Sequence, residues 1–291
     1  MKEEGKNNIK KIKNILSDIP NKGDNKDFDV LFLVDATGSM GSYIISAKEE
    51  TKNISKELRK LYPEMNFRYG YIFYRDPIDS PSDTHEIIDL TDNVNSFPEK
   101  IAKIGATGGG DSPEDWVGAY KLANEKISWR DGRKLIIHLA DAGAHGKLFT
   151  LSDKYPEEEA KLIHELEKCA EKKINIFGFV IDEEAARSFN ECAKIYRNKG
   201  GFFEVTDFMP PEMKNNMMNN IYPPMGMGAM PPMGMGGMPP MGMMNNMNGA
   251  PMMNKMHSAP MMNMNMNFQA MNNMQFSDNA IRSISLTLNK K

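Results

Sequence analysis

A carboxylate and two hydroxyls occur at alternate positions directly after a short apolar run. Asp35, Thr37 and Ser39 follow residues 30–34, which are all apolar. Such a run is typical of a buried strand, so the three side chains would lie on the loop that leaves it. Carboxylate and hydroxyl oxygens are the ligands that small, hard cations such as Mg²⁺ prefer. The spacing indicates a candidate metal-binding loop, whereas Asp35 taken alone would more often be a turn residue or a helix cap.

Hydrophobic periodicity divides residues 28–205 into short apolar runs that alternate with amphipathic stretches. This alternation is typical of strands joined by crossover helices in a largely parallel sheet. The predicted fold class is therefore α/β, with a six-stranded, mostly parallel sheet that carries helices on both faces. We expect strands at 28–34, 67–74, 85–90 (at an edge), 135–139, 174–181 and 202–205. We expect helices after the first strand and near 96–104, 113–127, 156–171 and 183–198.

Three loops of the predicted sheet carry oxygen ligands. In an open parallel sheet, ligands bind beyond the carboxyl ends of the strands, where the strand order reverses. Loops 35–41, 105–115 and 141–146 should meet there. Asp141 follows its strand as Asp35 follows the first, so two carboxylates are expected side by side, where a cation would relieve their repulsion. The sequence thus predicts a divalent-cation site for Mg²⁺, or for Mn²⁺ or Ca²⁺.

Several motifs in a fixed order extend this interpretation to a family. They are Asp35-x-Thr37-x-Ser39, Tyr74-Arg75-Asp76, the glycines 108–110 followed by Asp111 with Glu114-Asp115, and Asp141-Ala142 with His145-Gly146. With these motifs, residues 28–207 resemble the von Willebrand factor A family, and most of all its intracellular members beside alpha-kinase domains. The resemblance implies a Rossmann-like fold and a metal-ion-dependent adhesion site. That site uses Asp-x-Ser-x-Ser, a Thr or acidic residue on a second loop, and an Asp on a third.

Two positions depart from the family pattern. Thr37 stands where most members have Ser, which keeps a hydroxyl ligand. On the second loop the residue after the three glycines is Asp111 rather than Thr, and the loop resembles that of integrin beta A-like domains. The second-loop ligand is therefore open among Asp111, Glu114 and Thr107, in that order. A further carboxylate would favour tight cation binding but weaken the attraction for an acidic partner residue.

The function that the resemblance implies is a non-enzymatic protein-binding module. One position on the ion would be exchangeable, and a Glu or Asp of a protein partner would take it. An alternative is a Mg²⁺-dependent phosphotransferase or phosphatase with an Asp nucleophile, because residues 35–39 faintly resemble the Asp-Lys-Thr-Gly-Thr loop of P-type ATPases. The lysine of that loop is missing, and Asp141 is not followed by the lysine and paired carboxylates that this chemistry needs.

Composition divides the chain near residue 208. Of the 26 methionines, 23 lie between Met209 and Met274, among Asn, Pro and Gly. We therefore predict one domain at 28–208 and a low-complexity, disordered tail at 209–291, which cannot bury enough apolar surface to fold. Its Met-x-Met spacings leave open a scaffold role with Cu(I) binding, and 281–288 alternates like a transient strand.

The remaining features concern partners and location. The formal net charge of -3 gives no basic footprint for nucleic acid. Residues 1–27 form a basic amphipathic segment. The sequence contains no run of about 20 apolar residues, so we expect no membrane span. Two cysteines without metal-ligand spacing are typical of a reducing compartment, so we expect a cytoplasmic protein.

Overall fold

The computed structural model describes residues 25–76, 85–109, 113–153, 155–208 and 259–288. Most of the predicted basic segment 1–27 and most of the methionine-rich stretch lie outside the described residues. Residues from Phe268 onward belong to the same compact unit as the chain up to Phe208, and Met209–Asn267 forms a second unit. None of the described helices is long and apolar enough to cross a membrane.

Six strands form one twisted sheet in the order β3-β2-β1-β4-β5-β6. All neighbouring pairs are parallel except β2 and β3, which run antiparallel. The six-stranded, mostly parallel sheet and its third strand at an edge are therefore confirmed. The strands are β1 (Asp27–Asp35), β2 (Asn66–Tyr74), β3 (His85–Thr91), β4 (Arg133–Ala140), β5 (Ile174–Val180) and β6 (Phe203–Asp207).

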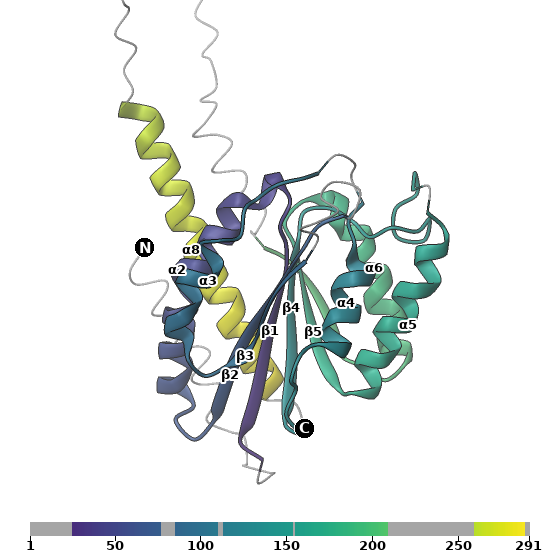
Figure 1. Cartoon of the computed structure of the whole chain (residues 1–291), viewed down its shortest axis with the longest axis horizontal. Helices are drawn as coiled ribbons and strands as arrows, with labels where there is room; N and C mark the ends of the chain where they lie inside the picture. The colour runs from purple at the N-terminus through teal and green to yellow at the C-terminus, as the bar shows by residue number, and fades with distance from the viewer. Residues whose placement is uncertain (1–24, 77–84, 110–112, 154, 209–258, 289–291) are drawn as a thin grey trace, which may run out of the picture. The chain divides into compact units, whose positions relative to one another are not determined.

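Helices cover both faces of the sheet, as the alternating sequence pattern predicted (Figure 1). In Figure 1, α4, α5 and α6 lie on one side of the strands, and α2, α3 and α8 lie on the other. Each helix buries one face, because its apolar residues recur at helical spacing. Their bounds are α2 (Gly41–Leu61), α3 (Phe97–Ile101), α4 (Trp116–Glu125), α5 (Glu157–Glu171), α6 (Glu183–Asn198) and α8 (Ala259–Leu288), with short 3-10 helices η1 (Gly38–Met40) and η2 (Val94–Ser96).

Helix α8 corrects the sequence interpretation of the last part of the chain. The sequence predicts disorder over residues 209–291 and a transient strand at 281–288, but the structure has one helix over Ala259–Leu288. Both predictions are wrong for this helix. They considered local composition alone, whereas the helix is stabilised by what it packs against.

The described side chains of α8 dock on the sheet face that also carries α2. Phe276 is buried and stacks on Phe32 of β1, with ring centroids 5.5 Å apart. Ala280 and Ile284, one and two turns further along, are also buried. The hydroxyl of Tyr62 donates to Ser285 Oγ at 2.9 Å. Three buried apolar residues at four-residue spacing thus give the described part of α8 one face that packs on the sheet.

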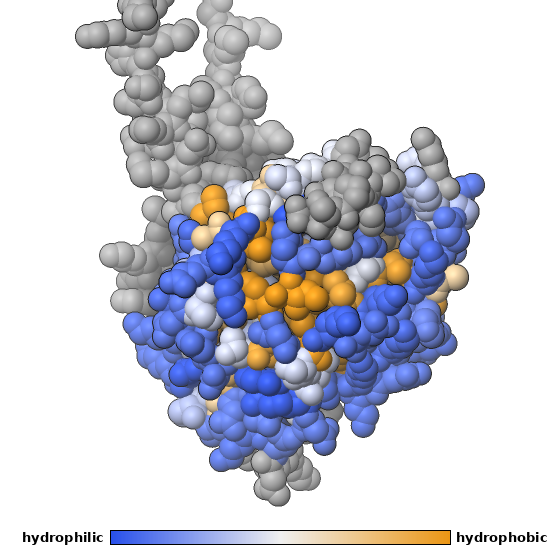
Figure 2. All heavy atoms as spheres, in the orientation of Figure 1, coloured by the Kyte–Doolittle hydropathy of each residue, from blue (hydrophilic) through white to orange (hydrophobic). Residues whose placement is uncertain are grey.

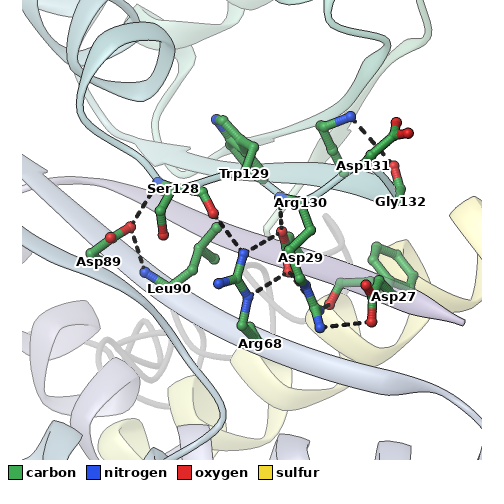
Figure 3. Close-up of polar contacts among 12 residues, drawn as sticks. Asp27, Asp29, Arg68, Asp89, Leu90, Ser128, Trp129, Arg130, Asp131 and Gly132 are labelled. Carbon is green, nitrogen blue, oxygen red and sulfur yellow. Dashed lines mark hydrogen bonds and ion pairs between the residues drawn. The ribbon is translucent and has the colours of Figure 1, made fainter.

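A charged cluster ties the amino ends of β1 and β2 to the segment before β4 (Figure 3). Asp29 is buried and accepts hydrogen bonds from Arg68 Nη2 at 2.8 Å and from Arg130 Nε at 2.9 Å. Burial alone would raise the pKa of Asp29, but the hydrogen bonds from both guanidinium groups lower it below its ordinary value. The cluster lies at the opposite end of β1 from Asp35, so it stabilises the fold and leaves the candidate site untouched.

The edge strand β3 presents charged side chains beside a partly exposed apolar one. Glu86 accepts from Arg75 Nη1 at 2.8 Å, and Ile87 next to it is 40% exposed. Figure 2 shows apolar side chains gathered in the middle of the viewed face, with hydrophilic side chains around them. A charged side chain on an edge strand disfavours pairing with further strands.

Replacing Phe276 by alanine should lower the free energy of unfolding by about 3 kcal/mol, because it removes a buried, stacked ring. Met274 on the same helix is 47% exposed. The matched variant Met274→Ala should therefore change stability by less than about 0.5 kcal/mol. Urea unfolding of the full chain, followed by circular dichroism, measures both. Equal and small effects would contradict the docking of α8 on the sheet.

Candidate functional site

The strand order brings two aspartates to the same end of the sheet. The chain passes from β1 to β2 on one side, while β4 lies on the other, so the order reverses between β1 and β4. Asp35 is the last residue of β1, and Asp141 directly follows β4, in which Leu139 lies opposite Val34. Parallel strands end at the same edge of a sheet, so both carboxylates lie at the switch point where such folds bind ligands.

Backbone hydrogen bonds join the three predicted loops. The Thr107 N–H donates to the Ala36 carbonyl at 3.2 Å, and the Gly38 N–H donates to the Gly108 carbonyl at 3.4 Å. The Glu114 N–H donates to the Gly143 carbonyl at 2.8 Å. The predicted convergence of the loops after β1, before α4 and after β4 is therefore confirmed.

The segment that ends β2 holds these loops in place. Arg75 Nε donates to the Ala36 carbonyl at 3.1 Å, and Arg75 Nη2 donates to the Gly105 carbonyl at 2.5 Å. The backbone N–H of Asp76 donates to Glu114 Oε2 at 2.9 Å. Arg75, Asp76 and Glu114 are all at least 97% buried. Two consecutive residues thus contact the first loop, the glycine-rich loop and the acidic residue that precedes α4.

A cavity of about 520 Å³ opens where the loops meet. Hydroxyl and carboxylate side chains dominate its lining. The lining residues are Thr37, Ser39, Ser42, Tyr43, Gly109, Glu114, Asp141, Ala142, Ile181, Asp182 and Glu184.

Asp35 lies fully buried beside this cavity and orders the loop that follows it. Its Oδ1 accepts from the Thr37 N–H at 2.9 Å and from the Thr37 hydroxyl at 2.8 Å. The Thr37 and Ser39 hydroxyl oxygens are 3.4 Å apart. Three of the predicted ligands are therefore adjacent, with the threonine between the carboxylate and the serine.

Two carboxylate oxygens at this point lack a hydrogen-bond partner. Asp35 Oδ2 and Asp141 Oδ1 are both buried, and no donor among the residues that the structure describes reaches them. Burial and the negative charge of Asp141 raise the pKa of Asp35 to about 7, against the two hydrogen bonds from Thr37. Buried polar atoms are almost always satisfied in folded proteins, so two unsatisfied and mutually repelling oxygens need an explanation.

A small, hard cation fits this arrangement. Among the residues that the structure describes, no three His, Cys, Asp or Glu side chains form a metal-binding group. The described oxygens available to a cation here are the hydroxyls of Thr37 and Ser39 and the carboxylates of Asp35 and Asp141. Oxygen ligands of this kind suit Mg²⁺, Mn²⁺ or Ca²⁺ and not a softer metal.

The second-loop candidates lie in different places. Glu114 lines the cavity, and its carboxylate accepts a hydrogen bond from the backbone N–H of Asp76. Thr107 is exposed and is not among the cavity-lining residues. Asp111, the first-ranked candidate, lies outside the described residues.

A buried histidine between two aspartates supports the loop after β4. His145 Nε2 donates to Asp76 Oδ2 at 2.5 Å, and His145 Nδ1 donates to Asp153 Oδ1 at 2.9 Å. Burial alone would lower the pKa of His145, but the hydrogen bonds and charges of Asp76 and Asp153 raise it to about 9. The histidine is therefore an imidazolium with a carboxylate on each nitrogen, and not a metal ligand.

Two further acidic residues of the sequence motifs, Asp76 and Asp115, form a loop salt bridge and a helix cap. Asp76 pairs with His145, while Asp115 caps α4 by accepting from the Gly118 N–H at 2.6 Å. Asp153 was missed, because no motif or periodicity connects it with a histidine eight residues before it.

Asp182 was also missed, although a signal for it was present. Asp182 follows β5 closely, as Asp35 and Asp141 follow their strands, and it lines the same cavity. The rule that loops after parallel strands meet at one edge applies to this loop as well.

The geometry defines the class of the protein, an α/β domain with a ligand-binding site at the switch point of an open sheet. A family model described as von Willebrand factor A domain matches residues 29–200, which is more than half of the chain. The chain therefore belongs to the von Willebrand factor A domain family, as the sequence motifs predicted.

Known relatives match only a part of their own length. Alpha-protein kinase vwkA of Dictyostelium discoideum is 32% identical over 130 residues, which are 44% of this chain and 20% of the kinase. Integrin beta-1 of Gallus gallus is 23% identical over 211 residues, with 57% of this chain and 26% of the integrin covered. The open conformation of the pilus adhesin SpaC from Lactobacillus rhamnosus GG gives a TM-score of 0.45 at 12% identity, over 68% of this chain and 30% of that one. The chain thus spans less than a third of each of these proteins.

The stability of the fold should depend on His145 in alkaline solution. Because folding raises the pKa of His145 from 6.5 to about 9, its ion pairs contribute fully below about pH 6.5 and are lost as the pH rises through 9. The difference in unfolding free energy between wild type and His145→Gln should therefore shrink by roughly 2 kcal/mol from pH 6 to pH 10. Urea unfolding over this pH range measures it. His164→Gln, a change at an exposed histidine of α5, is the control, and an equal pH dependence of the two variants would contradict the ion pairs.

Proposed function

We propose that this chain is a non-enzymatic protein-binding module that holds a divalent cation, in the first place Mg²⁺, at the carboxyl ends of β1 and β4. The observation that carries the proposal is the pair of buried, unpartnered oxygens Asp35 Oδ2 and Asp141 Oδ1. A cation between them would give both oxygens a partner and would offset the repulsion that helps to raise the pKa of Asp35.

The residues that would hold the ion are Asp35, Thr37, Ser39 and Asp141. Glu114 is the second-loop residue best supported among the described candidates, because its carboxylate is both in the cavity lining and fixed by Asp76. When bound, the ion would supply an electrophilic position for one further carboxylate oxygen. The open cavity above Ser39 and Asp141 gives that carboxylate its approach.

The proposed ligand of this position is an acidic residue of a protein partner. Support comes from the family to which the chain belongs, whose adhesion sites the motif Asp35-x-Thr37-x-Ser39 resembles. The exposed carboxylates of Asp182 and Glu184 at the rim would oppose a strongly acidic partner surface. A single acidic residue in a neutral or basic setting therefore suits the cavity best.

The described side chains offer poor support for catalysis. His138 is held between the hydroxyls of Tyr74 and Tyr120, at 2.7 and 3.1 Å, and burial lowers its pKa far below the ordinary value. Cys169 and Cys192 are free and buried, and burial raises the pKa of both thiols, to about 12 for Cys169. A buried neutral imidazole and two inert thiols are what a structural core uses. Two free thiols are also consistent with the proposed cytoplasmic location.

Mg²⁺ should bind the full chain with one ion per molecule, and Asp35→Asn should abolish this binding. The same substitution should raise the stability of the metal-free protein by about 1 kcal/mol, because it removes one of two repelling buried charges. Titration calorimetry and thermal unfolding with Mg²⁺ or chelator measure the two effects. Asp131→Asn, at an exposed acid before β4, is the matched control.

Two results would contradict the proposal, one for the ligand assignment and one for the non-enzymatic function. Unchanged Mg²⁺ binding in Asp35→Asn would exclude this carboxylate as a ligand. Metal-dependent release of phosphate from phosphorylated substrates by the pure protein, lost in Asp35→Asn, would exclude the non-enzymatic function and favour the phosphotransferase alternative.

Partner capture should depend on the ion. We expect proteins retained by the wild type in Mg²⁺ to be released by chelator and to be absent with Asp35→Asn, because the partner's carboxylate would bind through the cation. Affinity capture followed by mass spectrometry compares wild type, Asp35→Asn and Asp131→Asn. Identical partner lists with Mg²⁺ and with chelator would show that recognition uses another surface.

A further inference from the structure

The positively charged side chain of His145 links the loop after β4 to the end of β2. Its side chain is 8% exposed and forms ion pairs with Asp76 at 2.5 Å and with Asp153 at 2.9 Å. Asp153 also accepts from the Gly146 N–H at 2.6 Å, so the aspartate closes the turn that carries the histidine. The histidine is thus fixed from both sides before it reaches Asp76.

Asp76 transmits this position to the cavity. Its side chain is held by His145, while its backbone N–H donates to Glu114 Oε2 at 2.9 Å. The Glu114 N–H donates to the Gly143 carbonyl, two residues before His145. Glu114 is therefore held at its backbone by the loop that carries His145 and at its carboxylate by the residue that pairs with His145.

The buried negative charges around His145 explain why a positively charged side chain stands at this position. Asp76, Asp153 and Glu114 are each at least 93% buried, so their negative charges are poorly screened by water. The imidazolium of His145 forms an ion pair with each of the two aspartates that it contacts. A neutral residue in its place would remove both ion pairs, while Asp153 would keep its hydrogen bonds from the Gly146 and Tyr155 N–H groups. A buried carboxylate that loses a cation moves toward water when the backbone permits. Asp76 would then take its N–H away from Glu114.

We propose that His145 is a positioning residue that fixes Glu114 in the cavity through Asp76 and thereby sets the cation affinity of the site. This inference rests on the proposed function, because the affinity concerns the same cation. It adds a residue that touches neither the ion nor a partner, and it assigns Glu114 as the second-loop group through which that residue acts.

The test compares Mg²⁺ affinity in His145→Gln, Glu114→Gln and the double variant of the full chain. We expect each single variant to bind Mg²⁺ about tenfold more weakly and the double variant to bind no more weakly than Glu114→Gln, because both changes act through one carboxylate. His164→Gln is the matched control and should bind like wild type. A further tenfold loss in the double variant, or wild-type affinity in His145→Gln, would overturn the proposal.

A second measurement does not depend on the ion. The amide resonance of Asp76 in nuclear magnetic resonance spectra reports its hydrogen bond to Glu114 and should shift in both His145→Gln and Glu114→Gln without metal. An unchanged Asp76 amide in His145→Gln would overturn the positioning role even if Mg²⁺ affinity falls. If the wild type binds no Mg²⁺ but the amide shifts as expected, the proposed function fails and the positioning of Glu114 stands.

Asp76→Asn provides a milder variant if His145→Gln does not fold. It keeps the backbone N–H and a polar side chain but removes one of the two ion pairs of His145. We expect a weaker Mg²⁺ affinity in the same direction. A wild-type affinity of Asp76→Asn would overturn the proposal in this variant as well.

Discussion

Two like charges in a buried place are the constraint on which this site depends. Asp35 and Asp141 end or follow adjacent parallel strands, so the sheet itself forces their carboxylates together. Moving either one would require a different strand register, and the core would then present the wrong side chains. The surrounding loops reduce the cost by hydrogen bonds from Thr37 to one oxygen of Asp35. What they leave unsatisfied, among the residues that the structure describes, is one oxygen of each aspartate.

Much of the fold and part of the site follow from short-range patterns. Buried strands such as β1 and β4 are continuous apolar runs, and the rule that parallel strands end at one edge placed Asp35 beside Asp141. The same rule brought Glu114 close, because α4 begins where the glycine-rich loop ends. The sequence was therefore enough to predict that these loops meet.

The remaining features depend on contacts between distant residues that no local pattern records. In the sequence, nothing distinguishes Asp153 from any other loop aspartate; its role comes from its contact with His145. Helix α8 has a composition that favours disorder, and it is held by Phe276 on Phe32, whose partnership spans most of the chain. Glu114 was ranked before Thr107 as a second-loop ligand, but no local pattern records that the Asp76 N–H holds its carboxylate at the cavity. Long-range packing overrides propensity in each case.

The place of α8 in the chain has a consequence for synthesis on the ribosome. Fifty residues separate the last described residue after β6, Phe208, from the first of α8, Ala259. At about 5–20 residues per second, their translation takes roughly 3–10 s. During that interval all six strands have been made, yet the sheet face around Phe32 still lacks the helix that covers it. The nascent chain therefore passes through a stage with an open apolar face, at which a chaperone has time to act.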